Sequence, residues 1–196
     1  SGWSNGSTYA VGAATWANGA TGLVGPVSAS NSLIGKKQGD RACEGGATAL
    51  SNGNYVVSSV YWSTGLGTME GAVTWRNGSI SSPGVVDVDN SLVGSKTYDQ
   101  VGFGGVWPLA NGNYVVSSPH WHDGSGGNFG AATWGDGLQG TVGVVDATNS
   151  LVGGTAGDAV SYGGVVALAN GDFVVVSTTW SNGGAADAGA VTYGVG

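Results

Sequence analysis

Short apolar runs separated by glycine-rich polar turns follow one another along the whole chain. From residue 45, GGATAL is followed by Asn52-Gly53 and then by NYVVSSVYW. An Asn-Gly pair between two apolar runs is the strongest short-range signal for a tight β-hairpin. β-branched and aromatic residues fill the runs, and helical periodicity is absent. The pattern therefore predicts an all-β chain.

Four short strands are predicted in each structural unit. In the stretch that begins at residue 45 they cover residues 47–50, 55–62, 72–75 and 85–92. A second Asn-Gly pair, Asn77-Gly78, turns the chain between the third and fourth strands. Adjacent valines such as Val56 and Val57 point to opposite faces of a strand, which indicates strands covered on both sides.

The pattern repeats with a period of 59 residues and without insertions. Residues 45–103 and 104–162 are identical at thirty aligned positions. Tryptophans mark one column of the repeat, because Trp3, Trp62, Trp121 and Trp180 are each 59 residues apart. A fixed period indicates supersecondary blocks stacked on their neighbours. We divide the single repeat domain, residues 1–196, into units 1–44 (partial), 45–103, 104–162 and 163–196 (partial).

Four antiparallel strands in about sixty residues match one β-propeller blade. The run DAVSYGGVVALANGDFVVVSTTWSNGGAADAGAVTYG, residues 158–194, resembles the FG-GAP repeat of integrin-type propellers, and the likeness covers nearly the whole chain. The resemblance implies tandem four-stranded, β-propeller-like blades of 59 residues, incomplete at both ends. The units also resemble repeats of bacterial haemagglutinin- and adhesin-like surface proteins, which implies a role in adhesion.

The loop between the first two strands departs from the calcium-binding FG-GAP pattern. Calcium-binding members carry an Asp-rich loop there, whereas this chain has SNGN, ANGN or ANGD. One acidic residue at most cannot supply the six to eight oxygen ligands that calcium prefers. We therefore expect no calcium at this loop.

Composition and charge exclude several classes of partner. Lysine and arginine number 5 against 12 aspartates and glutamates, and the net charge of −7 disfavours nucleic acid. No run approaches eighteen apolar residues, so membrane insertion is not expected. Cys43 is the single cysteine, which excludes an intrachain disulfide. Few lysines, many Asn, Ser, Thr and Gly residues, and a first residue other than methionine suggest a secreted or cell-surface protein.

The ends of the repeat predict association between chains. Residues 1–19 align with residues 178–196, so part of a unit occurs twice and each terminal unit is incomplete. An exposed strand edge is a template for pairing with another chain. We expect a homo-oligomer formed through strand edges at both termini, either a closed ring of two chains or an open filament. The alternative is that the ends are arbitrary points in a longer array.

Catalytic chemistry finds little support in the sequence. His120 and His122 lie on one face of a strand with Asp123 nearby, but no third firm metal ligand accompanies them. Asp87 and Asp89 pair in one unit only, and Cys43 has no histidine in its own unit. We expect neither an enzyme nor a cofactor nor a metal site.

Binding is the better-supported class. Each tryptophan of the column above ends a predicted second strand beside a polar loop, where an indole could stack on a sugar. The candidate ligand-binding residues are Trp3, Trp62, Trp121, Trp180, Asp40, Asp99 and Asp158. The alternative is that these tryptophans fill the seams between units. Two further columns are assigned to structure: Trp16, Trp75, Trp134 and Tyr193, and Asn31, Asn90 and Asn149.

The sequence thus predicts a non-enzymatic, extracellular adhesin or lectin-like module that binds surface glycans through repeated loops. The alternative is a self-assembling structural subunit that forms a filament or sheath by strand complementation between chains.

Overall fold

The computed structural model describes residues 2–65 and 67–196. Within these residues every regular element is a strand, which confirms the all-β, tandem-repeat prediction. The strands are β1 (Ala13–Thr15), β2 (Ser32–Ile34), β3 (Gly46–Ala49), β4 (Tyr55–Ser59), β5 (Ala72–Arg76), β6 (Gly84–Val85), β7 (Leu92–Val93), β8 (Gly105–Pro108), β9 (Tyr114–Ser118), β10 (Ala131–Gly135), β11 (Gly143–Val144), β12 (Ser150–Val152), β13 (Val165–Ala167), β14 (Phe173–Ser177) and β15 (Ala190–Gly194).

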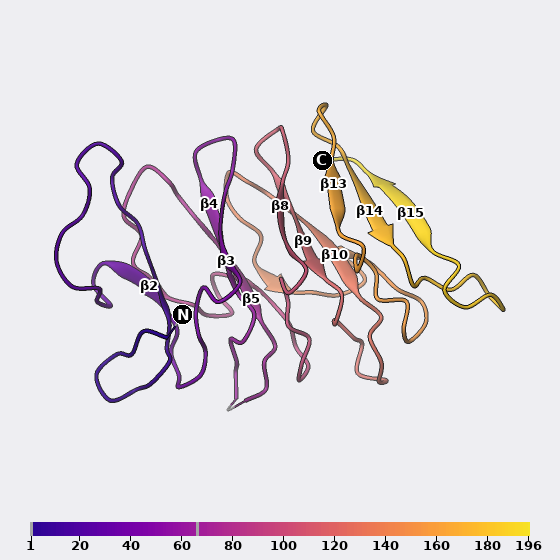
Figure 1. The fold of residues 1–196 in the computed structure, drawn as a ribbon, viewed down its shortest axis with the longest axis horizontal. Coiled ribbons are helices and arrows are strands. Elements are labelled where there is room, and N and C mark those ends of the chain that lie inside the picture. The colour runs from indigo at the N-terminus through magenta and orange to yellow at the C-terminus, as the bar shows by residue number, and fades with distance from the viewer. Residues whose placement is uncertain (1, 66) are drawn as a thin grey trace.

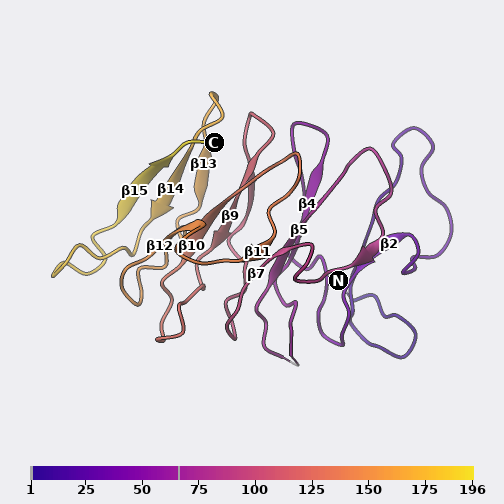
Figure 2. The ribbon, with the colours of Figure 1, turned by 180° about the vertical axis from the view of Figure 1, so that it is seen from behind.

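In the described part of the chain the strands form four sheets that stand side by side in chain order (Figure 1). Their strand orders are β1-β2-β6, β11-β7-β5-β4-β3, β12-β10-β9-β8 and β13-β14-β15. The first and last sheets lie at opposite ends of the row in both views (Figure 2). The row is therefore open.

Each complete unit contains an antiparallel three-stranded meander whose first turn is the expected hairpin. In the second unit, Ala49 of β3 pairs with Tyr55 of β4, and the Leu50 amide donates to the Asn54 carbonyl across the turn (2.8 Å). Strand β4 ends at Ser59, three residues earlier than predicted, because the Trp62 amide turns back to the Ser59 carbonyl (3.0 Å).

The fourth predicted strand, residues 85–92, is wrong as a single element. Its first part is β6, which lies parallel to β2 of the preceding unit, whereas its end is β7, antiparallel to β5 of its own unit. Asn90 closes the turn between them: its Oδ1 accepts from the Asp87 amide (3.1 Å) and its Nδ2 donates to the Val85 carbonyl (2.8 Å). This interaction confirms a structural role for the asparagine column.

The next unit repeats the arrangement. Strand β11 lies parallel to β7 of the preceding unit, and β12 pairs with β10 of its own unit (Figure 2). Each of these two units therefore completes the sheet of the unit before it. The second sheet gains a fifth strand in this way, which the prediction of four-stranded blades did not include.

The hydrophobic core lies in the seams between consecutive sheets. The first seam cluster contains Leu33, Ala42, Val57, Trp62, Ala72, Val86 and Val93. The second contains Leu50, Val56, Val73, Leu92, Val101, Tyr114, Val116, Trp121, Ala131 and Val145. A third cluster joins the last two units through Leu109, Val115, Ala132, Val160, Val165, Phe173 and Val175. Val86 and Val145, which directly follow β6 and β11, are completely buried.

Candidate functional site

The tryptophans at the ends of the second strands face the interior in both complete units. Trp62 is 4% exposed and Trp121 is 6% exposed. The Trp62 indole N–H donates to the Val86 carbonyl, and that of Trp121 donates to the Val145 carbonyl, both at 3.1 Å. These indoles therefore present no face to a ligand, and they hold the strand-crossing segments in the seams. Trp3 and Trp180, in the terminal units, are partly exposed.

The aspartate column lies beside these tryptophans, as expected, but in the interior. The Asp99 Oδ2 accepts from the amides of Ser95 and Lys96 (2.9 and 2.8 Å). Its Oδ1 accepts from the amide of His122, immediately after Trp121 of the next unit (3.2 Å). Asp99 thus joins one unit to the next.

The other two aspartates make equivalent contacts. The Asp158 Oδ2 accepts from the amides of Gly154 and Thr155, and its Oδ1 accepts from the amide of Ser181 in the last unit (3.0 Å). The Asp40 Oδ2 accepts from the amides of Lys36 and Lys37. All three side chains are buried, so their carboxylates are occupied by the protein itself.

Burial controls the ionisation of two of these carboxyl groups. Desolvation raises the pKa of Asp40 and of Asp99 above the ordinary value, although the backbone N–H donors favour the charged form and lower it. A carboxyl group surrounded in this way is a structural acceptor.

The histidines belong to the second seam. The His120 Nδ1 lies 2.8 Å from the Gln100 Oε1, and burial lowers the His120 pKa. The His122 Nε2 lies 3.1 Å from the Thr97 carbonyl. Among the described residues, no group of three or more His, Cys, Asp or Glu side chains is placed to hold a metal ion.

The second aromatic column does not have one uniform environment. The Trp16 indole N–H donates to the Gly78 carbonyl (2.9 Å) and that of Trp75 to the Gly137 carbonyl (3.0 Å), so both join consecutive units as structural residues. Trp134 and Tyr193 are exposed instead, which corrects their assignment to packing.

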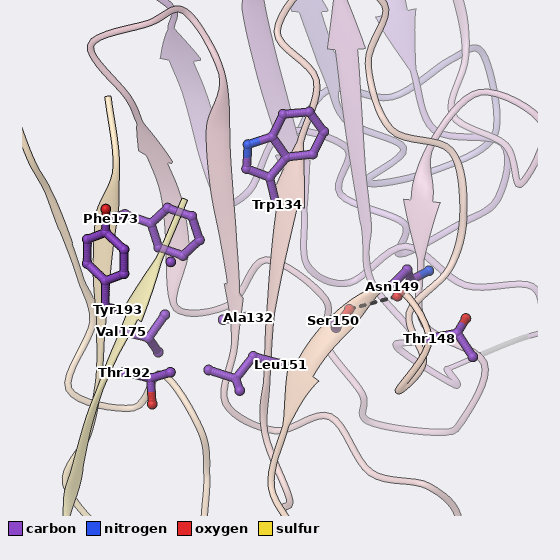
Figure 3. Close-up of a pocket in the computed structure, with 11 residues that line it drawn as sticks. Ala132, Trp134, Thr148, Asn149, Ser150, Leu151, Phe173, Val175, Thr192 and Tyr193 are labelled. Atoms are coloured by element: carbon purple, nitrogen blue, oxygen red, sulfur yellow. Dashed lines mark hydrogen bonds between the residues drawn. The ribbon is translucent and has the colours of Figure 1, made fainter. Parts of the chain in front are cut away.

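An open cavity of about 360 Å³ lies between the last two units, beside these exposed rings. It is lined by Ala132, Trp134, Thr148, Asn149, Ser150, Leu151, Phe173, Val175, Thr192, Tyr193 and Gly194. Leu151 of β12 points across it toward Val175 and Thr192 of the last sheet, and Trp134 stands at one end (Figure 3). The walls are mostly apolar side chains and strand edges.

Sequence reasoning missed this cavity because several of its apolar residues, Leu151 among them, have buried counterparts elsewhere in the repeat. Leu33 and Leu92, 59 residues apart in the same column as Leu151, are fully buried. Because the residue is leucine at all three positions, the column gives no signal that Leu151 is the exposed member.

No helix among the described residues is both long and apolar enough to cross a membrane. No curated protein matches the sequence. The sequence does match the model of a family described as a repeat of unknown function, DUF5650, over residues 1–44, 49–103, 108–162 and 167–196. These segments span most of the chain, which therefore belongs to the DUF5650 family of repeats.

Proposed function

We propose that this chain is a non-enzymatic structural subunit that self-assembles by strand complementation. The observation that carries the proposal is the strand placed by one unit in the sheet of its predecessor, β6 on β2 and β11 on β7. An array built in this way is extended by adding further copies of the same segment, and an edge strand is a ready template for such pairing.

The contacts between units are those of a stable joint. Val86 adds a main-chain hydrogen bond to the Ile34 carbonyl (2.9 Å), and its buried side chain contributes about 2 kcal/mol of hydrophobic stabilisation. The Trp62 indole N–H donates a hydrogen bond to the carbonyl of the same valine. An equivalent joint between two chains would repeat these contacts between them.

Assembly is tested by sedimentation velocity of the purified chain over a hundredfold range of concentration. The proposal expects species that grow in mass with concentration. A monomer of constant mass over the whole range would refute it.

Glycan adhesion is the second candidate, and one observation favours it. A shallow cavity of about 380 Å³ at the seam between the last two units is lined by Tyr162, Asn128 and Thr179, among others. The Tyr162 ring is exposed and can stack on the apolar face of a sugar, while the Asn128 amide and the Thr179 hydroxyl can hydrogen-bond to sugar hydroxyl groups. Binding on a glycan array that is lost in Tyr162→Ala, but kept in Tyr98→Ala, would support this function.

Either function would be exercised outside the cell, at a surface or in a secreted assembly. The scarcity of lysine and the abundance of small polar residues support this location.

A further inference from the structure

We propose that the outer edge of β12, with the cavity beside it, binds the segment around Gly25–Val27 from a second copy of this chain. The inference rests on the proposed self-assembly and names its two contact surfaces. Both consist of residues whose counterparts in the repeat already contact each other inside the chain.

The accepting surface is identified by one leucine column. Leu33 in β2 is 2% exposed and Leu92 in β7 is 1% exposed, because β6 and β11 lie along those strands. Leu151 in β12 is 39% exposed, and β12 is an edge strand with β10 as its neighbour. The covered columns show what fits here, namely a parallel strand of sequence Gly-Val-Val.

The donating surface is identified by one valine column. Val86 and Val145 are 0% and 1% exposed in their seams, whereas Val27 is 43% exposed. Residues 25–27 read Gly-Pro-Val and align with Gly-Val-Val at residues 84–86 and 143–145.

The donating segment already has the required shape. The Asn31 Oδ1 accepts from the Ser28 amide (2.9 Å) and its Nδ2 donates to the Pro26 carbonyl (3.0 Å). Asn90 and Asn149 close the same turn behind the two segments that are docked. Little conformational entropy would remain to be lost on binding.

Proline at position 26 is compatible with this docking. In the β11 joint, the amides of Gly143 and Val145 donate to the carbonyls of Ser91 and Val93. In this parallel register the amides alternate in direction, so that of Val144 points away from β7. Pro26 occupies the Val144 position, so its missing N–H costs no bond. By the same register, Gly25 and Val27 would donate to Ser150 and Val152 of the accepting copy.

Strand β2, which follows the donating segment, shows how the copy that donates the segment (the incoming copy) fits onto the copy that accepts it. Strand β1 of the incoming copy and β15 of the accepting copy occupy the same position in the repeat, Ala13 corresponding to Ala190. On binding, β2 of the incoming copy would leave its pairing with β1 of its own chain and pair with the free edge of β15 in the accepting copy. Thr192 then meets the incoming Ser32, as Thr15 meets it within one chain (2.7 Å). Such an exchange of equivalent elements is a low-cost route to association.

Two charge substitutions at exposed positions test the pairing. Val27→Asp removes the donating side chain and Leu151→Asp the accepting one, while Leu138→Asp, at an exposed leucine outside both surfaces, is the matched control. By sedimentation velocity, Leu138→Asp assembles like wild type, and each of the other two variants alone stays monomeric. An equimolar mixture of Val27→Asp and Leu151→Asp forms a heterodimer and nothing larger, because one compatible pair of surfaces remains.

A labelled peptide of residues 23–35 separates this inference from the proposed function. We expect it to bind wild type and Val27→Asp at least tenfold more tightly than Leu151→Asp, by fluorescence anisotropy. Assembly that is unaffected by either substitution would overturn the inference and leave self-assembly standing. A monomeric wild type that still binds the peptide would refute self-assembly and retain the binding surface. Absence of selective peptide binding would overturn the surface itself.

Discussion

The carboxylate of Asp99 accepts a hydrogen bond from the backbone amide of His122, 3.2 Å away in the next unit. The same carboxylate also holds two amides of its own turn. One buried side chain thus fixes a loop and joins two units, and Asp158 does the same with Ser181 in the following seam.

Replacing this acceptor should destabilise the fold. Asp99→Ala leaves three backbone N–H groups without a partner. Since each unpaired group costs about 1–3 kcal/mol, we expect a loss of at least about 3 kcal/mol in the free energy of unfolding. Urea denaturation followed by tryptophan fluorescence measures it. Asp89→Ala, at an exposed carboxylate, is the control and should change little. Equal stability of the two variants would contradict the role of Asp99.

The buried carboxyl groups should also give a distinctive pH dependence. Burial raises the pKa of Asp99 in the folded state above its unfolded value of 3.8. Between the two values the folded state binds more protons than the unfolded state, so the stability contributed by this group falls as pH rises through the window. Urea midpoints of wild type, measured from pH 3.5 to 7, should therefore fall relative to those of Asp99→Asn. Parallel curves would argue against a raised pKa.

The indole hydrogen bond of Trp62 should be measurable by a conservative replacement. Trp62→Phe keeps an aromatic ring but leaves the Val86 carbonyl without its donor. We expect a loss of about 1–3 kcal/mol, set by that unpaired acceptor and the smaller ring. Trp107→Phe, at a partly exposed ring, should cost less. If Trp62→Phe unfolds no more easily than Trp107→Phe, the seam does not depend on Trp62.

Tyr98 offers a route to a more stable protein. Its φ angle is +68°, in the left-handed region, and the same column holds Gly39 (φ 84°) and Gly157 (φ 98°). Because a side chain is strained at such an angle, Tyr98→Gly should raise the free energy of unfolding by up to about 1 kcal/mol. Tyr98→Ala keeps the strain and should bring no gain. A gain from alanine as large as that from glycine would show that loss of the exposed ring, rather than backbone strain, is responsible.

Cys43 should be unreactive toward alkylating reagents in the folded protein. Burial raises the pKa of its thiol to about 12, so almost no thiolate exists near neutral pH. We expect iodoacetamide at pH 8 to modify Cys43 in 8 M urea and to leave it unmodified in buffer, as read by intact mass. Rapid labelling in buffer would show an accessible thiolate.

The parts of the fold that local chemistry determines were predictable from the sequence. The Asn52-Gly53 turn sits between β3 and β4, and the third strand matches its predicted range to within one residue. The run at residues 85–92 misled because it contains no glycine or proline. Its break is made by the side chain of Asn90, although asparagine and aspartate disfavour strands and could have signalled the turn.

The candidate site could not be resolved from the sequence for a different reason. A tryptophan at the end of a strand is consistent with a ligand platform or a core residue. For Trp62 the choice is made by Val86, which the fold brings over it from another segment. The exposure of Leu151 and Val27 likewise depends on which neighbouring segment is present. Their counterparts in the other units are the same residue types and are buried.

The segment that crosses from each unit to its predecessor also shifts the physical boundaries of the protein relative to its sequence period. The second sheet needs residues 46–93 together with the distant strand β11 at residues 143–144. A fragment cut at residue 103 would retain every residue of its own period and still lack an outer strand. Force applied to one unit would therefore be transmitted to the next unit before either one unfolded. The chain would resist stretching as a continuous array and not as a series of independent units.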